Sequence, residues 1–312
     1  MPILTSVAEL DLRVTDLAPL PPFRGVALAD PAEFDVAYAI NPHMLGPDGE
    51  LQQVDRTAAR EQWEALRGTL AGLGLEVTVE PALPGHLDFV FCANPGLPVP
   101  AEVAGGPPRW VSSRMAAAER AGEVAVWERV FAARGWRIEP LEGEAERFEG
   151  TGDGLWHPRR RLLWGGVGPR TDRRAWEELA ERYDLPVVTL ELTDPAYYHL
   201  DTCLAPLDER TCLWTPGAFA PEGQELVREL FEEAIEVPDE EARGAFACNA
   251  WAPDPGDGRR PVLLQRGAPR TVAALAERGF EVLELETGEF LKSGGSVFCM
   301  KLHHGPLEDE PV

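Results

Sequence analysis

The stretch EQWEALRGTLAGLG (61–74), followed at once by LEVTVE (75–80), decides the fold. Apolar side chains recur at helical spacing in its first part and charged residues lie between them, as on a helix with one buried face. Leu75, Val77 and Val79 then alternate with polar residues, which is the pattern of a half-buried strand. The stretch therefore predicts a surface helix that leads directly into a β-strand.

The same order of a helical segment and an alternating strand recurs four more times along the chain. The five copies span residues 61–80, 118–141, 173–192, 221–238 and 269–286. Short apolar runs precede the helices, at 35–40, 108–113, 161–166, 211–216 and 261–265. Others follow the strands, namely LDFVFCAN, ERFEGTGDGL, YYHLDTCLAP, ARGAFACNA and SVFCMKL. Each unit is therefore expected to have the order strand–helix–strand–strand over roughly 50 residues.

Recurrence of one unit at a fixed period is typical of radial or solenoidal repeat proteins. Because every unit contains a helix, an all-β propeller is excluded. An ordinary doubly wound α/β sheet is the alternative, but the constant order of the elements favours the repeat array. No internal segment is long and polar enough to separate two domains. The whole chain, 1–312, is thus expected to form one domain with a short N-terminal extension and an acidic C-terminal tail, GPLEDEPV.

The chain has 29 Lys and Arg residues against 53 Asp and Glu, and its formal net charge is −24. Phosphate groups need a cationic surface, so we exclude nucleic acid and anionic membranes as partners, whereas a small cationic ligand is favoured. No run of about 18 apolar residues predicts a transmembrane helix, and the N-terminus lacks the regions of a signal peptide. We therefore expect a cytoplasmic protein. The sequence leaves its oligomeric state open, a homo-oligomer included.

Several polar residues stand out in the segments that follow the repeat strands. Asp88 interrupts the apolar run LDFVFCAN, where an unpaired carboxylate is costly. Glu149 and Asp153 flank two glycines in FEGTGDG, which indicates close backbone approach within a cluster of negative charge. His199 and Asp201 are two residues apart, so on a strand they face the same side. That arrangement suits an acid–base imidazole and a carboxylate that share one ligand, although a surface histidine beside an aspartate is the plainer alternative.

The five cysteines are widely scattered, and no two of them form a CxxC pair; they are Cys92, Cys203, Cys212, Cys248 and Cys299. Neither a disulfide framework nor a zinc ribbon is therefore expected. Cys299 follows the flexible pair Gly294 and Gly295 near the C-terminus. Taken alone, it is either a buried small side chain or a nucleophilic thiol.

Together these motifs resemble the guanidino-group modifying superfamily, which holds arginine deiminases, arginine dihydrolases, dimethylarginine dimethylaminohydrolases and amidinotransferases. The resemblance runs from YAINPHM (38–44) through LDFVFCAN, FEGTGD, YYHLDT and FACNA to FLKSGGSVFCMKL (290–302). Each motif alone is weak, but the order Asp, Glu-Gly-x-Gly-Asp, His-x-Asp and a C-terminal Cys is highly specific. The resemblance implies the pentein fold, a five-bladed α/β propeller of strand–helix–strand–strand repeats with pseudo-five-fold symmetry, in agreement with the repeats found above.

The resemblance also implies roles for the residues that match the motifs. Cys299 would be the nucleophile and His199 the general acid/base. Glu149, Asp88 and Asp201 would be the carboxylates around the substrate guanidinium, with Glu149 also helping His199 to activate water.

Further residues match the substrate-binding positions of the superfamily. Arg120 matches the arginine that holds the substrate carboxylate, and Arg170 matches a second one. Asn41 matches a residue of the members that resemble arginine dihydrolases, and Asn94 stands where the dimethylarginine enzymes carry an acid. Asp153 completes the acidic cluster and is expected to contribute to substrate binding.

The implied function is hydrolysis of a guanidino C–N bond of arginine through a covalent thiouronium on cysteine, giving citrulline, or ornithine after a second hydrolysis. The bound cation is expected to help form the thiolate, since nearby acids raise the pKa of the thiol in the empty site. No metal or organic cofactor is required. The alternatives are a dimethylarginine dimethylaminohydrolase, an amidinotransferase and a non-catalytic arginine-binding protein. A carboxylate at Asp201 favours unmethylated arginine, because methyl groups would crowd it.

Overall fold

The structure, a computed structural model, describes residues 3–305, within which the strands form five separate sheets. The strands are β1 (Ile3–Leu4), β2 (Gly25–Ala29), β3 (Glu76–Glu80), β4 (Gly96–Val99), β5 (Arg109–Ser112), β6 (Arg137–Pro140), β7 (Gly154–Trp156), β8 (Leu163–Val167), β9 (Val187–Glu191), β10 (Leu204–Pro206), β11 (Thr211–Trp214), β12 (Glu233–Glu236), β13 (Pro261–Gln265), β14 (Glu281–Leu285) and β15 (Leu302–His304). The expected acidic tail lies, apart from Gly305, outside the described residues.

Four of the sheets share one pattern, in which an antiparallel pair is extended by a third strand parallel to the middle one. They are β15-β2-β3, β4-β5-β6, β7-β8-β9 and β10-β11-β12. The fifth sheet consists of β13 and β14, and a single antiparallel bridge between Trp251 and Leu263 takes the place of its first strand. Strand β1 extends the third sheet beside β9. Strand β15, the last strand of the described residues, thus completes the sheet that contains β2 and β3 from the first part of the chain.

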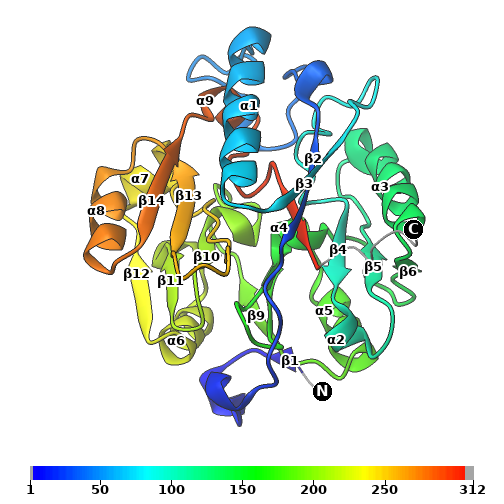
Figure 1. The fold of residues 1–312 in the computed structure, drawn as a ribbon, viewed down its shortest axis with the longest axis vertical. Coiled ribbons are helices and arrows are strands. Elements are labelled where there is room, and N and C mark those ends of the chain that lie inside the picture. Colours follow the sequence, from blue (N-terminus) through cyan, green and yellow to red (C-terminus); the bar gives the residue numbers. More distant parts are fainter. Residues whose placement is uncertain (1–2, 306–312) are drawn as a thin grey trace.

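In each of the five sheets, one helix joins the two parallel strands that follow one another in the repeat unit, as a parallel connection requires. The helices are α1 (Arg56–Gly72), α2 (Ala101–Ala104), α3 (Ala121–Ala133), α4 (Gly150–Asp153), α5 (Arg173–Arg182), α6 (Pro221–Leu230), α7 (Asp239–Gly244), α8 (Pro269–Glu277) and α9 (Gly288–Leu291). The connecting helices are α1, α3, α5, α6 and α8, and Figure 1 shows α1, α3, α6 and α8 at the outside of the molecule. The short α4 lies near the centre, where the segment before β15 also passes.

The five pairs of a helix and the strand that follows it are confirmed. In α1, the side chains of Trp63, Leu66 and Leu70 are buried. Asp55 caps this helix by accepting hydrogen bonds from the backbone of residues 57 and 58. Pairing of β2 with β3 then aligns Val26 with Val77. Helical periodicity therefore identified the faces that pack on the sheets.

The strand expected at residues 35–40 was wrong, because the first strand of the first sheet is β2. Every residue of β2 is buried between β15 and β3, whereas the burial along 35–40 is mixed. In that segment the carboxylate of Asp35 accepts from Arg56 and the hydroxyl of Tyr38 donates to Asp88. The segment contributes side-chain contacts and does not supply a ladder of backbone hydrogen bonds.

The last strand of each expected repeat also needs correction. The run 87–94 forms turns, and β4 begins only after it. The run 197–206 forms a 3-10 helix first, and only its last three residues form the strand β10. Each of these strands then joins the sheet of the next unit. His199 and Asp201 are therefore not on a strand, because His199 precedes a 3-10 helix, Leu200–Thr202, that contains Asp201. The residues that stood out in the sequence lie in these connecting segments.

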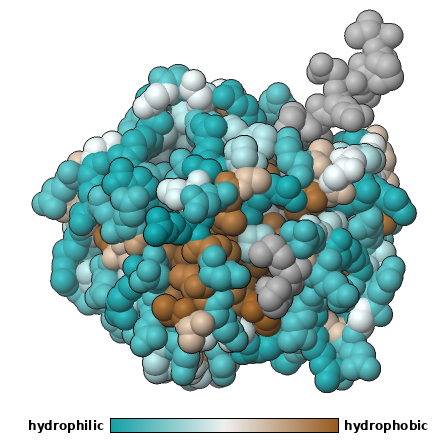
Figure 2. Space-filling model, turned by 90° about the horizontal axis from the view of Figure 1, so that it is seen from below, coloured by the Kyte–Doolittle hydropathy of each residue, from teal (hydrophilic) through white to brown (hydrophobic). Residues whose placement is uncertain are grey.

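The surface agrees with the acidic composition over most of the face drawn in Figure 2, which is hydrophilic around a central apolar area. Among residues 3–305, no helix combines the length and the apolar character that crossing a membrane demands.

Candidate active site

Connecting segments from different sheets meet in one small pocket near the centre of the molecule. Its walls contain Ile40, Asn41, Met44, Asp88, Phe91, Asn94, Arg120, Arg170, Tyr198, His199, Ser293, Gly295 and Cys299. Seven of the ten expected site residues are among them. Glu149, Asp153 and Asp201 are not in the walls and lie one layer behind.

The sulfur of Cys299 is held between an amide and a carboxylate. Asn249 donates from Nδ2 to Sγ at 3.1 Å, and Sγ lies 3.2 Å from Oδ2 of Asp201. The Oδ1 of Asn249 accepts from the backbone N–H of Phe298 and of Cys299. The other oxygen of Asp201, Oδ1, is buried and has no hydrogen-bond partner among the described residues. An unpaired buried acceptor is costly, so it marks a place where a ligand can donate.

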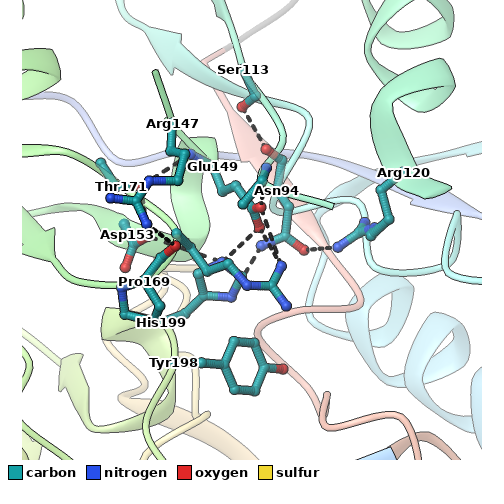
Figure 3. A network of polar contacts seen from close by, with 12 residues as sticks. Asn94, Ser113, Arg120, Arg147, Glu149, Asp153, Pro169, Thr171, Tyr198 and His199 are labelled. Carbon is teal, nitrogen blue, oxygen red and sulfur yellow. Dashed lines mark hydrogen bonds and ion pairs between the residues drawn. The ribbon is translucent and has the colours of Figure 1, made fainter. Parts of the chain in front are cut away.

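His199 is fixed by a buried acid behind it. Its Nε2 lies 2.8 Å from Oε2 of Glu149, and its Nδ1 lies 3.5 Å from Nδ2 of Asn94 (Figure 3). Glu149 also binds Arg170 Nη1, at 3.1 and 3.2 Å. The imidazole therefore donates from Nε2 to a carboxylate, which orients the ring and leaves Nδ1 to face the amide of Asn94.

The glycines of the FEGTGDG motif permit the close packing that this arrangement needs. Gly150 has a φ of +50°, and a Cβ on it would lie 2.2 Å from the carbonyl oxygen of Gly96. A Cβ on Gly152 would lie 2.4 Å from Nδ2 of Asn94. Asp153, at the end of α4, accepts from the hydroxyl of Thr171 and from the backbone N–H of residue 200. Asp153 therefore ties α4 to the histidine segment.

Asp88 is the carboxylate in the pocket wall. Its Oδ2 accepts from the hydroxyl of Tyr38 at 2.8 Å and its Oδ1 accepts from the hydroxyl of Ser293 at 2.7 Å. Each oxygen keeps a lone pair for a further donor. The sequence suggested that burying Asp88 unpaired would be unfavourable, but each of its oxygens accepts a hydrogen bond.

Arg120 is buried and almost fully engaged within the protein. It forms an ion pair with Glu123 at 2.7 Å and donates to Oδ1 of Asn94 at 2.7 Å. It also donates to the carbonyls of Asp88 and Phe91. These bonds hold the segment 88–94 and differ from the expected contact with a substrate carboxylate, because few of its N–H groups stay free.

Asn41 and Arg170 join the N-terminal part of the chain to the pocket. Asn41 caps a 3-10 helix (Pro42–Met44) by accepting from the backbone of residue 43, and it donates to the carbonyl of Ser293. Arg170 donates to the carbonyl of Ile40 at 2.7 Å. Both residues therefore fix the segment that covers the pocket.

The buried ionisable groups differ in their pKa values. Burial would raise the pKa of Glu149, but the hydrogen bond and charge of His199 and the charges of nearby arginines outweigh it and lower the pKa to about 2. Burial and the charge of Asp153 raise the pKa of Asp201 to about 6. Burial, followed by the charge of Asp201, raises the pKa of the Cys299 thiol well above its usual range. The direction for Cys299 agrees with the expectation for the empty site.

Sequence reasoning gave no role to three residues that complete the site, which are Asn249, Ser293 and Tyr198. Asn249 lies in FACNA and Ser293 in FLKSGG, both quoted as motifs above. The aromatic ring of Tyr198 lies 5.2 Å from the guanidinium of Arg170, and its hydroxyl donates to the carbonyl of Gly294. Burying an uncharged side chain that orients another group carries no large energetic penalty, so such a residue does not stand out in a sequence as a buried carboxylate does. Within residues 3–305, no group of three or more His, Cys, Asp or Glu could hold a metal ion.

Comparison with known proteins relates this site to guanidino chemistry. Residues 115–304 match the family model described as N,N dimethylarginine dimethylhydrolase, eukaryotic. The N(G),N(G)-dimethylarginine dimethylaminohydrolase of Mycobacterium tuberculosis is 39% identical over 92% of this chain and 87% of its own length. The bifunctional arginine dihydrolase/ornithine cyclodeaminase AgrE of Nostoc sp. is 34% identical over 91% of this chain, which spans only 38% of that longer protein.

A solved structure extends this similarity to three dimensions. The N-terminal domain of ArgZ, an arginine dihydrolase from the ornithine–ammonia cycle in cyanobacteria, was solved with its product. It matches with a TM-score of 0.80 at 32% identity, over 89% of this chain and 96% of that domain. A variant of the same domain was solved covalently bonded to a reaction intermediate. The family match and these relatives show that the chain belongs to the N,N-dimethylarginine dimethylhydrolase family and has its mixed α/β fold, which the arginine dihydrolase ArgZ shares.

Proposed function

We propose that this protein hydrolyses a guanidino C–N bond of arginine or a close derivative through a covalent intermediate on Cys299. One observation carries the proposal: a thiol, an imidazole and a carboxylate, from Cys299, His199 and Asp88, line one pocket although they are far apart in the chain. The relatives named above act on arginine or dimethylarginine, and a related domain carries a covalent intermediate, which supports the same chemistry.

Two carboxylates are suited to binding the planar cation. Asp88 faces the pocket with a free lone pair on each oxygen. Asp201 lies beside the sulfur through its Oδ2, and its unpartnered Oδ1 would accept an N–H of the guanidinium once the guanidinium carbon reaches Cys299. Charge-assisted hydrogen bonds of this kind would hold the cation planar and aim its carbon at the sulfur.

The reaction proceeds by substitution at the guanidinium carbon. The positive charge of the substrate lowers the pKa of the thiol, His199 takes the thiol proton, and the thiolate attacks to form an S–C bond. His199 donates a proton to the departing nitrogen as the C–N bond breaks, which leaves a thiouronium on Cys299. His199 then takes a proton from water, which adds to the same carbon. Breaking of the S–C bond returns the thiol and releases citrulline, and a second hydrolysis would give ornithine. No step requires a metal or organic cofactor.

The remaining site residues act through these groups. Glu149 orients His199, and Arg170 fixes Glu149. Arg120 positions Asn94 and the backbone around Asp88. Asn41 and Asp153 hold the segments on either side of the pocket, at Ser293 and Leu200 respectively.

Arginine is the favoured substrate over dimethylarginine. A buried acceptor such as Oδ1 of Asp201 discriminates against an analogue that lacks an N–H, because the acceptor would stay unpaired. Asn94 supports the same choice, since it supplies a neutral amide near His199 where the dimethylarginine enzymes are expected to carry an acid. Dimethylarginine is the second candidate, on the 39% identity to a dimethylarginine dimethylaminohydrolase.

We further infer that residues 1–312 form one domain in which the five sheets are the blades of an α/β propeller. Pairing of β15 with β2 supports closure of a ring, because the last strand of the described chain completes the first sheet. Convergence of the connecting segments on one pocket supports the same arrangement.

Product analysis tests the proposed reaction. Purified protein is incubated separately with arginine, asymmetric dimethylarginine and agmatine, and the products are identified by mass spectrometry. We expect ammonia with citrulline or ornithine from arginine, and a covalent mass increase on intact protein quenched during turnover. Both signals should disappear in Cys299→Ala, with a loss of activity of at least about 10⁴-fold.

Cys212→Ala is the matched control, because this buried thiol of β11 is not in the pocket walls. It should keep full activity and the mass increase. Full activity of Cys299→Ala would refute the proposal. Formation of a guanidino product when glycine is added would instead assign an amidinotransferase, and arginine binding without turnover would assign a binding protein.

A further inference from the structure

A second and larger cavity lies on the other side of the segment that carries Cys299. It encloses about 1380 Å³, including the space at its mouth, and shares no lining residue with the pocket of Cys299. Its walls include Phe23, Trp156, Trp251, Phe298 and His303 together with several prolines. Charged residues line the rest of the cavity, so an aromatic wall faces a polar one. Concave cavities that combine apolar walls with placed polar groups are the usual form of a site for a small molecule.

The innermost wall is a cluster of rings around His303. The ring of Trp251 is stacked with that of His303 at a centroid distance of 5.8 Å and an interplanar angle of 22°. Phe23 and Phe298 meet the same imidazole edge-on, at 4.8 and 5.8 Å. Flat aromatic walls of this kind favour a planar ligand, which gains stacking contacts that a branched aliphatic molecule cannot make.

His303 provides a single directed polar group in this wall. Its Nδ1 lies 2.6 Å from Nζ of the fully buried Lys301, which also lies over the rings of Phe298 and Trp251. Burial and the charge of Lys301 lower the pKa of His303, so its imidazole is neutral. Burial also lowers the pKa of Lys301, but its amine can donate in either protonation state, so we assign Nδ1 as the acceptor and place the ring proton on Nε2. That N–H has no partner among the described residues.

Each charged residue that lines this cavity has an ion-pair partner, inside or outside the lining. Glu209 binds Arg160 at 2.6 Å. Arg260 binds Asp208 at 2.6 Å, and Arg159 binds Asp254. Arg259 binds Asp257 at 2.8 Å. These pairs offer no unmatched charge to a ligand, and they differ in this from Asp88 and Asp201, the carboxylates near Cys299 that form no ion pair among the described residues. The cavity therefore suits an uncharged molecule.

We propose that this cavity is a second ligand site, which takes a small, uncharged, planar heteroaromatic molecule. The ligand stacks against Trp251 and accepts a hydrogen bond from Nε2 of His303. This site is independent of the proposed guanidino chemistry, because the two pockets have separate walls. The site nevertheless adjoins the nucleophile through the chain, since Phe298 lines this cavity and the next residue, Cys299, lines the other.

A matched pair of probes tests the site. Quinoline has one acceptor nitrogen and is neutral at pH 8, whereas naphthalene has the same shape and no acceptor. Binding of each is followed by ligand-observed NMR on the full-length protein, with and without saturating ornithine as an occupant of the Cys299 pocket. We expect quinoline to bind about two- to tenfold more tightly than naphthalene, which is the effect of one hydrogen bond. Ornithine should not displace it.

Two variants separate this cavity from the rest of the surface. Ala252→Trp places a large ring in the cavity wall and should abolish quinoline binding while arginine turnover is kept. Val79→Trp adds the same ring at an exposed position of β3 and should change neither. Thermal unfolding of both variants checks that they are folded.

Three results would overturn the proposal. Equal affinity for quinoline and naphthalene would show that His303 does not donate to the ligand. Unchanged quinoline binding by Ala252→Trp would place the probe elsewhere. Concentration-dependent self-association that Ala252→Trp abolishes would assign the cavity to a second copy of the chain. None of these results depends on whether the protein hydrolyses arginine.

Discussion

Glu149 and Asp201 are two carboxylates of the same site, equally buried, whose pKa values move in opposite directions. Glu149 has no exposed surface and Asp201 is 1% exposed. The pKa of Glu149 is lowered to about 2, whereas that of Asp201 is raised to about 6. Burial opposes ionisation of both, so burial cannot explain the difference.

The neighbours of each carboxylate explain it. Glu149 accepts from His199 and binds Arg170, so its charge is fully matched. Asp201 faces the thiol of Cys299 and has one oxygen without a partner. The charge of Glu149 is balanced by protein groups without a ligand, whereas Asp201 has no cationic partner from residues 3–305 in contact with it. In the proposed reaction, the substrate guanidinium is that partner.

The largest expected effect is that of Glu149→Gln. Loss of the carboxylate that orients His199 should lower kcat by about 10²- to 10⁴-fold. The lowering of the pKa of Glu149 from 4.5 to about 2 corresponds to about 3 kcal/mol of stability at neutral pH. Steady-state kinetics and urea unfolding at pH 7 measure the two losses.

The sign of this stability effect sets its pH dependence. Because the pKa of Glu149 is depressed by folding, its contribution is fully present above pH 4.5 and is lost as pH falls towards 2. The difference in unfolding free energy between wild type and Glu149→Gln should therefore shrink on acidification through this range. An unchanged kcat together with wild-type stability at pH 7 would contradict the assignment.

Asp201→Asn should have the opposite effect on stability. The pKa of Asp201 is raised from 3.8 to about 6 on folding, so ionisation of this group costs stability as pH rises through that range. The neutral amide avoids this cost, and the variant should gain about 1–3 kcal/mol relative to wild type between pH 4 and pH 8. Urea unfolding of the variant and the wild type at pH 4 and at pH 8 measures this gain in unfolding free energy.

Activity provides the second readout for Asp201→Asn. The variant should lose turnover while it gains stability at pH 8, because the negative charge that would pair with the guanidinium in the proposed reaction is removed. A variant that is less stable than wild type by the same amount at pH 4 and pH 8 would show that Asp201 does not ionise as described. Retention of full turnover would exclude it from substrate binding.

A smaller effect is expected on the reactivity of Cys299. The charge of Asp201 helps to raise the pKa of the thiol, so Asp201→Asn should speed alkylation by iodoacetamide at pH 8 by about three- to tenfold. Mass spectrometry of the peptide that contains Cys299 follows the rate. Equal rates in variant and wild type would mean that Asp201 does not act on the thiol.

The smallest effect serves as the reference for the other three. Glu144 forms an ion pair with Arg174 at the surface, and the two side chains are 83% and 62% exposed. Glu144→Gln should change the unfolding free energy by less than about 0.5 kcal/mol and leave kcat unchanged, because solvent screens this pair. Urea unfolding and kinetics under the conditions used for Glu149→Gln provide the test. A loss comparable to that of Glu149→Gln would undermine the comparison between buried and exposed carboxylates.

The regular part of the fold was predictable from the sequence. The buried face of α1 follows from the spacing of Trp63, Leu66 and Leu70, and the same logic identified the other four connecting helices. The candidate residues were found as well, because a carboxylate such as Asp88 in an apolar run is conspicuous. Seven of the ten expected residues line one pocket.

The backbone of the connecting segments could not be predicted in this way. The run 87–94 is apolar enough for a strand, yet it forms turns because its backbone carbonyls accept from Arg120. The expectation that His199 and Asp201 share one face assumed a strand and was wrong for the same reason. Contacts with distant residues, and not local periodicity, determine these conformations.

The sequence by itself determined the five units, the chemistry of their connecting segments and the resemblance to enzymes of guanidino groups, because periodicity and residue type are local properties. Only the tertiary structure decided which acid lies behind the histidine, which lies beside the sulfur, and that the arginine at 120 binds the protein's own groups. The energy of a buried charge depends on its neighbours within a few ångströms, and folding brings those neighbours from segments far apart in the chain.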